Sequence, residues 1–320
     1  MSQIPQLFLN DPTQPVESVL ASLPPLSATM ISRRCQTLAS RSLKGDSQAA
    51  GLDLAIRCVD LTTLEGADSP GRVRRLVARA ITPDPSDLTC PSPAAVCVYP
   101  NLVASARTAL GVPGAGTASS NIKIASVAGA FPSGLAPLPV RLDEIRSAVA
   151  SGADEIDIVI DRGMFLAGRY QEVFNDLVAA RQAAGPARLK TILETGELTT
   201  VENIWRAAWL AALAGTNFLK TSTGKSGVGA TPEAVWVLAA VAQRFAEATG
   251  QPLGVKISGG VKSAKDALRL MLVVADHTGS QGLVPDRFRL GASTLLDDLC
   301  AQRRFHATNR YWGPEYFPLG

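Results

Sequence analysis

The chain has 320 residues, of which 46% are hydrophobic, so it is long and apolar enough to bury a large core, and α/β barrels often use such a length as one domain. Its 31 basic and 28 acidic residues leave a net charge of +3, and aromatic residues make up 5%, so we expect no nucleic-acid or membrane partner. No apolar run reaches the roughly 18 residues of a membrane span, and no basic start precedes an apolar stretch, so we expect neither a membrane helix nor a signal peptide.

The cysteine and histidine content points to a reducing compartment and away from a metal site. The five cysteines contain no C-x-x-C pair, and an odd number fits a protein that forms no disulfide framework. His277 and His306 are the only histidines, too few for a typical zinc cluster. We therefore expect a cytoplasmic protein without a bound metal.

In chain order, residues 1–50 are expected to form an extension, because prolines interrupt the first half and one helix is predicted near 32–42. A barrel over 51–304 and a tail over 305–320 are expected to follow. Strands are predicted at 55–61, 95–99, 122–128, 155–160, 188–194, 216–221, 253–258 and 288–292. Helices are predicted near 71–80, 101–110, 141–151, 169–184, 200–213, 232–249 and 263–276, with another from about residue 293.

This strand–helix alternation predicts parallel strands joined by crossover helices, an α/β fold. Eight such units in a chain of this length favour a closed (β/α)8 barrel, the TIM barrel, with an N-terminal helical extension. An open doubly wound sheet is the alternative. We favour the barrel because closure leaves no exposed edge strand.

Side chains alternate across a strand, and this alternation predicts a charged barrel interior. Ile156 and Ile158 are expected to pack against the helices, so Asp157 faces the axis. The same reasoning directs Asp60, Lys220 and Lys256 inward. Two further inward candidates are Lys190 and Glu194. Such a layer could be structural, but the lysines stand near the strand ends where barrels carry their active sites.

Two inward lysines on neighbouring strands suit an amine nucleophile. A free lysine has a pKa of about 10.4 and is almost fully charged at neutral pH, so attack on a carbonyl requires a lowered pKa. Burial and a neighbouring ammonium both lower it. Lys220 is therefore the expected nucleophile, Lys256 the neighbouring cation that Asp60 keeps charged, and Asp157 the group that moves protons.

Three glycine-containing loops after the last three predicted strands favour a phosphate site. Glycines let backbone N–H groups approach an anion, and barrels often bind phosphate at their last strands. The candidate residues are Gly224, Lys225, Gly259, Gly260, Lys262, Gly291, Ser293 and Thr294. Ser293 is also expected to cap the helix that follows. A P-loop ATPase is excluded because Leu219 stands where that motif needs its first glycine.

Taken together, these residues resemble the deoxyribose-phosphate aldolases, a family of class I aldolases. The resemblance extends from about Cys58 to Thr294 and is closer to the longer members. It is carried by Asp60-Leu61-Thr62-Thr63-Leu64, Val96-Cys97-Val98-Tyr99-Pro100, Ala153 through Val159, Glu194-Thr195-Gly196-Glu197-Leu198, Leu219 through Lys225, Gly254-Val255-Lys256 with Gly259-Gly260, and Gly291-Ala292-Ser293-Thr294.

The resemblance implies reversible cleavage of 2-deoxy-D-ribose 5-phosphate to D-glyceraldehyde 3-phosphate and acetaldehyde, in deoxyribonucleotide catabolism. It implies a Schiff base on Lys220, a pKa-lowering role for Lys256, proton transfer by Asp157, and no metal or organic cofactor. Asp60 and Thr62 are counted with the substrate-binding residues. The partners expected are phosphorylated sugars and aldehydes, with a homodimer as a possible assembly. The alternatives are another class I phosphate-sugar aldolase or a transaldolase, and a barrel kept only as a scaffold.

Some positions stay open. The family commonly has Lys-Pro-Ala-Gly-Gly on the seventh strand, whereas Ile257 and Ser258 follow the lysine here. A tyrosine of the tail assists proton transfer in some relatives, which makes Tyr311 and Tyr316 candidates. Lys190 is the main alternative to Lys220 as nucleophile, although no phosphate loop adjoins it. Cys97 is expected inside the barrel as a small core residue.

Overall fold

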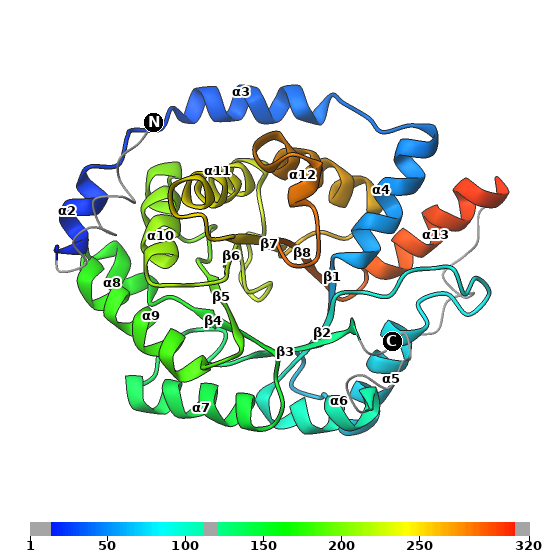
Figure 1. Cartoon of the computed structure of the whole chain (residues 1–320), viewed down its shortest axis with the longest axis horizontal. Helices are drawn as coiled ribbons and strands as arrows, with labels where there is room; N and C mark the ends of the chain where they lie inside the picture. Colours follow the sequence, from blue (N-terminus) through cyan, green and yellow to red (C-terminus); the bar gives the residue numbers. More distant parts are fainter. Residues whose placement is uncertain (1–13, 112–120, 311–320) are drawn as a thin grey trace.

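A computed structural model describes residues 14–111 and 121–310, and in it eight parallel strands close into a barrel in sequence order (Figure 1). Each strand pairs with the strands before and after it in sequence, and β8 pairs with β1 to complete the ring. The strands are β1 (Val59–Thr62), β2 (Ala95–Val98), β3 (Lys123–Val127), β4 (Glu155–Val159), β5 (Arg188–Ile192), β6 (Phe218–Lys220), β7 (Gly254–Ser258) and β8 (Phe288–Ala292). The predicted closed barrel is confirmed.

Helices surround this barrel (Figure 1). They are α2 (Val16–Ala21), α3 (Ala28–Ala39), α4 (Gly45–Arg57), α5 (Pro70–Ile81), α6 (Val103–Leu110), α7 (Leu138–Ala150), α8 (Arg162–Leu166), α9 (Tyr170–Ala184), α10 (Val201–Leu213), α11 (Pro232–Thr249), α12 (Ala264–Thr278) and α13 (Leu295–Thr308), with short 3-10 turns η1 (Pro100–Leu102) and η3 (Ser280–Gly282). All predicted helices are present, but α2, α4 and α8 were not predicted. None of the helices within the described ranges has the length and apolar character to cross a membrane.

Helix α4 corrects the first predicted strand. Residues 55–57 belong to the end of α4, and β1 begins only at Val59. The helix buries Leu52, Ala55 and Ile56, which lie on one helical face and pack into the apolar layer around the barrel. The segment 55–61 is therefore a helix end followed by a strand.

The alternation of side chains follows the prediction. In β4, Ile156 and Ile158 belong to the apolar cluster between strands and helices, and Asp157 is fully buried between them on the axial side. The interior is divided in two. Small apolar side chains of β2 and β3, including Ala95, Cys97 and Ala125, form one part, and the charged side chains of the remaining strands form the other.

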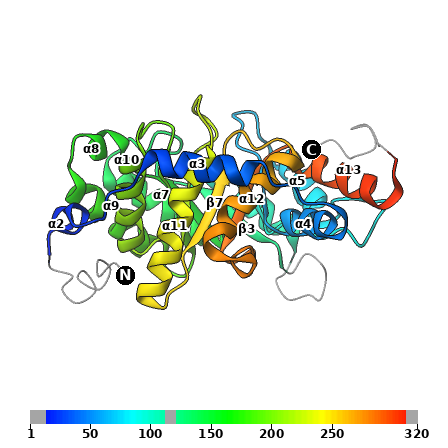
Figure 2. The same ribbon diagram turned by 90° about the horizontal axis from the view of Figure 1, so that it is seen from above.

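The N-terminal helices pack on the outside of the barrel (Figure 2). Helix α3 lies across α11 and α12, and α2 contacts α9 and α10. Ser27 caps α3 by accepting a hydrogen bond from the Met30 backbone N–H, and Ile31 and Leu38 are buried beneath it. The predicted boundary at residue 50 lies inside α4.

Candidate active site

Seven ionisable side chains meet inside the barrel, and each is at most 3% exposed. Parallel pairing places Asp157 beside Lys190, Lys220 beside Lys256, and Lys256 beside Arg289. The set consists of Asp60, Glu155, Asp157, Lys190, Lys220, Lys256 and Arg289, which we call the charge layer. Burial of so many charges is expensive unless they are paired, and every member has an ion-pair partner.

Asp157 links the two lysines predicted to do the chemistry. Its Oδ2 atom lies 2.7 Å from Lys220 Nζ and 2.8 Å from Lys256 Nζ. The two nitrogens are therefore no farther apart than the sum of these distances, about 5.5 Å. The structure thus brings Lys220, Lys256 and Asp157 into contact inside the barrel.

Asp60 and Glu155 bind the remaining cations of the charge layer. Asp60 Oδ2 accepts hydrogen bonds from Lys256 Nζ at 2.5 Å and Lys190 Nζ at 3.0 Å. Asp60 Oδ1 accepts one from Arg289 Nη1 at 2.6 Å. Glu155 pairs with Lys190 at 2.6 Å and receives both Arg289 Nη atoms, at 2.6 and 3.0 Å. The predicted contact of Asp60 with Lys256 is thus present.

The layer holds three carboxylates and four basic side chains, so its charges balance only when one base is neutral. Lys220 is the base with the fewest carboxylate partners, since among residues 14–111 and 121–310 it pairs with Asp157 alone. Burial lowers the pKa of Lys220 below its usual 10.5, and the ammonium of Lys256 adds to this effect, against the opposing field of Asp157. Lys220 is therefore the amine that deprotonates most readily.

The other two lysines behave in the opposite way. Burial acts to lower the pKa of Lys256, but the carboxylates of Asp157 and Asp60 outweigh it and raise that pKa above 10.5. The same balance raises the pKa of Lys190 well above its usual value, because Asp157, Asp60 and Glu155 all adjoin it. Both lysines stay charged at neutral pH, which weakens the case for Lys190 as nucleophile.

The carboxylates stay ionised. Burial alone would raise their pKa values, but the field of Lys190 and its cationic neighbours outweighs burial and holds the pKa of Asp60, Glu155 and Asp157 below the usual range. The phenyl ring of Phe218 packs beside Lys190 and Arg289 inside the barrel. The charge layer is therefore both paired and shielded from water.

A cavity of about 220 Å³ opens at the carboxyl ends of β1, β6, β7 and β8, and Lys220 lines it. All the residues predicted to bind substrate or phosphate except Asp60 line the same cavity: Thr62, Gly224, Lys225, Gly259, Gly260, Lys262, Gly291, Ser293 and Thr294. Across its opening, Lys225 Nζ lies 3.0 Å from Glu65 Oε1. The predicted loops thus converge on the tip of the predicted nucleophile.

In these loops one prediction is wrong, and one glycine has a clear structural reason. The capping position of α13 is Thr294, without a side-chain capping bond, so the prediction that Ser293 caps this helix is wrong. Gly259 has φ +85°, and a Cβ there would come within 3.0 Å of Gly229 Cα. The glycine is therefore required by a close backbone approach between two loops.

Sequence reasoning missed Arg289 as a member of the charge layer. The signal was present, because Phe288 and Leu290 on either side pack into the outer apolar cluster and direct Arg289 inward. Glu194, predicted to face inward, does not join the charge layer. It follows β5 with φ +54°, and its carboxylate accepts hydrogen bonds from the Thr223 hydroxyl at 2.5 Å and the Thr223 backbone N–H at 3.2 Å.

Comparison with known proteins assigns the family. The sequence profile of the DeoC/LacD family aldolases matches residues 54–297. The chain belongs to this family. It is 43% identical to the human deoxyribose-phosphate aldolase over 91% of this chain and 92% of that protein, and 42% identical to the mouse enzyme over 91% and 93%. A tetrameric deoxyribose phosphate aldolase structure from Aeropyrum pernix matches with a TM-score of 0.62 and 26% identity, covering 87% of this chain and 99% of that one.

As a DeoC/LacD family aldolase the protein is a carbon–carbon lyase, which agrees with the resemblance seen in the sequence. Cys97 lies inside the barrel in the small apolar cluster, as expected for a core residue. Burial raises the pKa of its thiol, with Lys256 acting in the opposite direction. Tyr311 and Tyr316 lie outside the described residues.

Proposed function

We propose that this aldolase reversibly cleaves 2-deoxy-D-ribose 5-phosphate to D-glyceraldehyde 3-phosphate and acetaldehyde through a Schiff base on Lys220. The observation that carries the proposal is the position of Lys220, whose pKa is lowered and whose side chain lines the cavity formed by the glycine-containing loops. The names of the human and mouse relatives support the choice of substrate.

Each step follows from this arrangement. The neutral amine of Lys220 attacks the C1 aldehyde of the open-chain sugar, and loss of water gives an iminium ion. The iminium accepts the electron pair of the C2–C3 bond as the C3 hydroxyl loses its proton, which releases glyceraldehyde 3-phosphate and leaves an enamine. Protonation of C2 and hydrolysis then release acetaldehyde and restore the amine.

Asp157 and Lys256 assist these steps next to the Lys220 amine. Asp157 contacts Lys220 at 2.7 Å, so it is within reach of the protons that nitrogen gains and loses, directly or through one water. Lys256 disfavours a second ammonium beside it and thereby keeps Lys220 neutral. Asp60 holds Lys256 charged at 2.5 Å and is a positioning residue.

The substrate phosphate is assigned to the loops after β6, β7 and β8. Lys225 and Lys262 supply cations, and the glycines allow backbone N–H groups to approach an anion. Thr62, at the end of β1 next to β8, lines the same cavity and is assigned to the sugar. With phosphate held there, the other end of a five-carbon substrate reaches toward Lys220.

We also propose a division of the chain into segments, a cellular location and an oligomeric state. Residues 1–50 serve as an extension, 51–304 as the catalytic barrel and 305–320 as a tail, supported by the continuous ring of strands between residues 59 and 292. A cytoplasmic location is supported by five free cysteines. A homodimer is proposed as the assembly, and gel filtration with light scattering tests it against a tetramer.

Comparison of substrates tests the function. We expect turnover of 2-deoxyribose 5-phosphate to exceed that of fructose 1,6-bisphosphate by orders of magnitude, and Lys220→Leu to abolish it. A preference for fructose 1,6-bisphosphate, or transfer of a three-carbon unit, would favour another class I aldolase or a transaldolase. Absence of turnover on every sugar phosphate would favour the scaffold alternative.

A further inference from the structure

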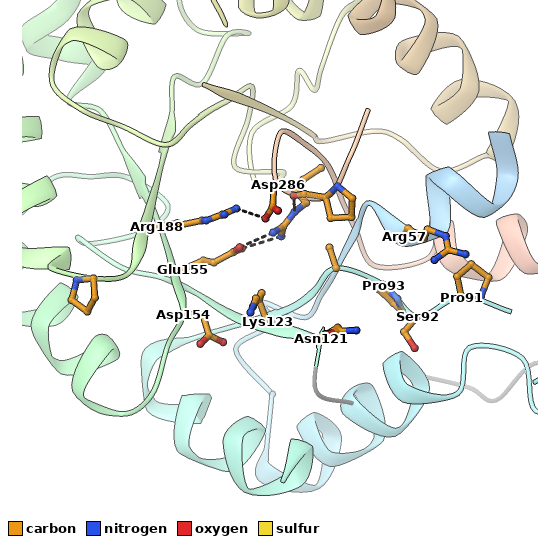
Figure 3. A pocket seen from close by; sticks show the side chains of 14 residues that line it. Arg57, Pro91, Ser92, Pro93, Asn121, Lys123, Asp154, Glu155, Arg188 and Asp286 are labelled. Carbon is orange, nitrogen blue, oxygen red and sulfur yellow. Dashed lines mark hydrogen bonds and ion pairs between the residues drawn. The ribbon is translucent and has the colours of Figure 1, made fainter. Parts of the chain in front are cut away.

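A second, larger cavity of about 860 Å³ opens at the end of the barrel opposite the active site. Its lining comes from residues just before or at the start of strands. Arg57 precedes β1, Lys123 begins β3, and Arg188 begins β5, whereas the phosphate loops follow the strand ends. Figure 3 shows Arg188 and Glu155 pointing into this cavity from one side, with Arg57, Pro91 and Pro93 on the other. The catalytic proposal leaves this cavity unused.

The carboxylates of the cavity are already paired. Asp286 pairs with Arg188 at 2.8 Å. Glu155 pairs with the Arg289 guanidinium. Asp154 pairs with Arg107, outside the cavity, and also accepts a backbone N–H.

Two basic side chains of the lining are not used in this way. Within residues 14–111 and 121–310, neither Arg57 nor Lys123 has an ion-pair partner. Arg57 and Lys123 therefore give the cavity positive charge that no neighbouring carboxylate neutralises within the described residues. Pro91, Pro93, Pro186 and Pro285 add rigid apolar surface to its walls.

The floor of this cavity is part of the charge layer. Arg289 and Glu155 line it, and Arg289 is only 1% exposed. Through Arg289 the cavity reaches Asp60 at 2.6 Å, and Asp60 in turn holds Lys256 at 2.5 Å. Asp157 then joins Lys256 to Lys220, so four ion pairs in series connect Arg289 to the nucleophile.

We infer that this cavity binds a phosphate monoester of nucleotide size and that binding there makes the Lys220 amine a weaker nucleophile. Arg57 and Lys123 lie at separate places in the lining (Figure 3), so each can offer one cation to a phosphate, while the apolar walls suit a ring body and the volume is within the range of small-molecule sites. The sign of the coupling follows from the charge layer, which becomes positive when Lys220 is protonated. Negative charge at the opposite end favours that state, so it disfavours the neutral nucleophile.

The kinetic test of this inference rests on the proposed function, whereas the binding test does not depend on it. A nucleoside 5′-monophosphate serves as the probe, because it joins a phosphate dianion to a ring body. Isothermal titration calorimetry on the full chain should show binding that weakens at least tenfold in Arg57→Gln/Lys123→Gln. The matched control, Lys225→Gln/Lys262→Gln, removes two cations from the active-site loops and should bind the probe as the unaltered protein does.

Kinetics test the coupling. The probe should move the acid limb of the kcat/KM profile to higher pH by about 0.5 unit, a shift expected for the screened negative charge of a phosphate at the opposite end of the barrel. Arg57→Gln/Lys123→Gln should keep the basal activity and lose the shift. Equal affinity in the two double variants, affinity lost only in Lys225→Gln/Lys262→Gln, or no binding at millimolar probe would overturn the site. Binding with an unmoved profile would overturn the coupling, and absence of aldolase activity would count against the proposed function alone.

Discussion

Removal of the positive charge at position 256 should change the pH dependence of the aldolase in a defined direction. The nitrogens of Lys256 and Lys220 both contact Asp157 Oδ2 and lie no more than about 5.5 Å apart. Two unit charges at that separation interact by about 3 kcal/mol at an effective dielectric constant of about 20. At 1.36 kcal/mol per pKa unit, Lys256→Met should raise the pKa of Lys220 by about 2 units.

The sign of the effect on rate follows from the need for a neutral nucleophile. Activity rises with pH as Lys220 deprotonates, so a higher pKa moves the acid limb of the profile toward alkaline pH. Loss of Lys256 also leaves Asp60 and Asp157 with one cation fewer, and both carboxylates then favour the charged form of Lys220. The two effects act in the same direction.

The assay is kcat/KM for 2-deoxyribose 5-phosphate between pH 5 and about 10, with folding of the variant checked by circular dichroism. Lys262→Met is the matched control, because Lys262 lies in the loop after β7 and lines the phosphate cavity but is outside the charge layer. It should raise KM and leave the acid limb in place. If the profile of Lys256→Met overlays that of the unaltered enzyme, Lys256 does not set the pKa of Lys220.

Three further predictions concern the layer and the loops. Arg289→Met leaves Asp60 short of a buried cation and should lower the free energy of unfolding by about 3–5 kcal/mol in urea denaturation, and a loss below about 1 kcal/mol would contradict its pairing role. Lys225→Met should raise KM about tenfold for the phosphorylated sugar but not for 2-deoxyribose, and an equal rise for both would remove it from the phosphate site. Gly259→Ala should destabilise the fold by about 1–3 kcal/mol in thermal unfolding because of its φ of +85°, whereas Gly227→Ala, which meets open space, should have little effect.

Most of the fold and much of the site could be predicted from strand alternation and from the order of elements. Alternating side chains placed Asp60, Asp157, Lys220 and Lys256 inside the barrel, and the glycine-containing loops located the cavity at the carboxyl ends of the strands. These features are encoded locally, by a period of two along each strand and by turn residues after it. The inward side chains and the position of the loops can therefore be predicted from one sequence alone.

What could not be predicted depends on contacts between distant segments. Residues 55–57 are predicted as part of a strand because a short segment with apolar residues does not distinguish a strand from a helix end. Packing against the rest of the fold makes them the end of α4. The capping position of α13 depends on backbone geometry and not on the presence of a serine. The lowered pKa of Lys220 depends on its burial, on the neighbouring ammonium of Lys256 and on the single carboxylate that pairs with it, and these contacts come from different strands.

Borohydride trapping in the presence of acetaldehyde, followed by mass mapping of the modified peptide, tests the central claim most directly. At neutral pH the account predicts a reduced two-carbon adduct on Lys220, lost in Lys220→Leu, because this lysine alone in the charge layer has a lowered pKa. An adduct on Lys190 or Lys256, or none at neutral pH, would contradict it.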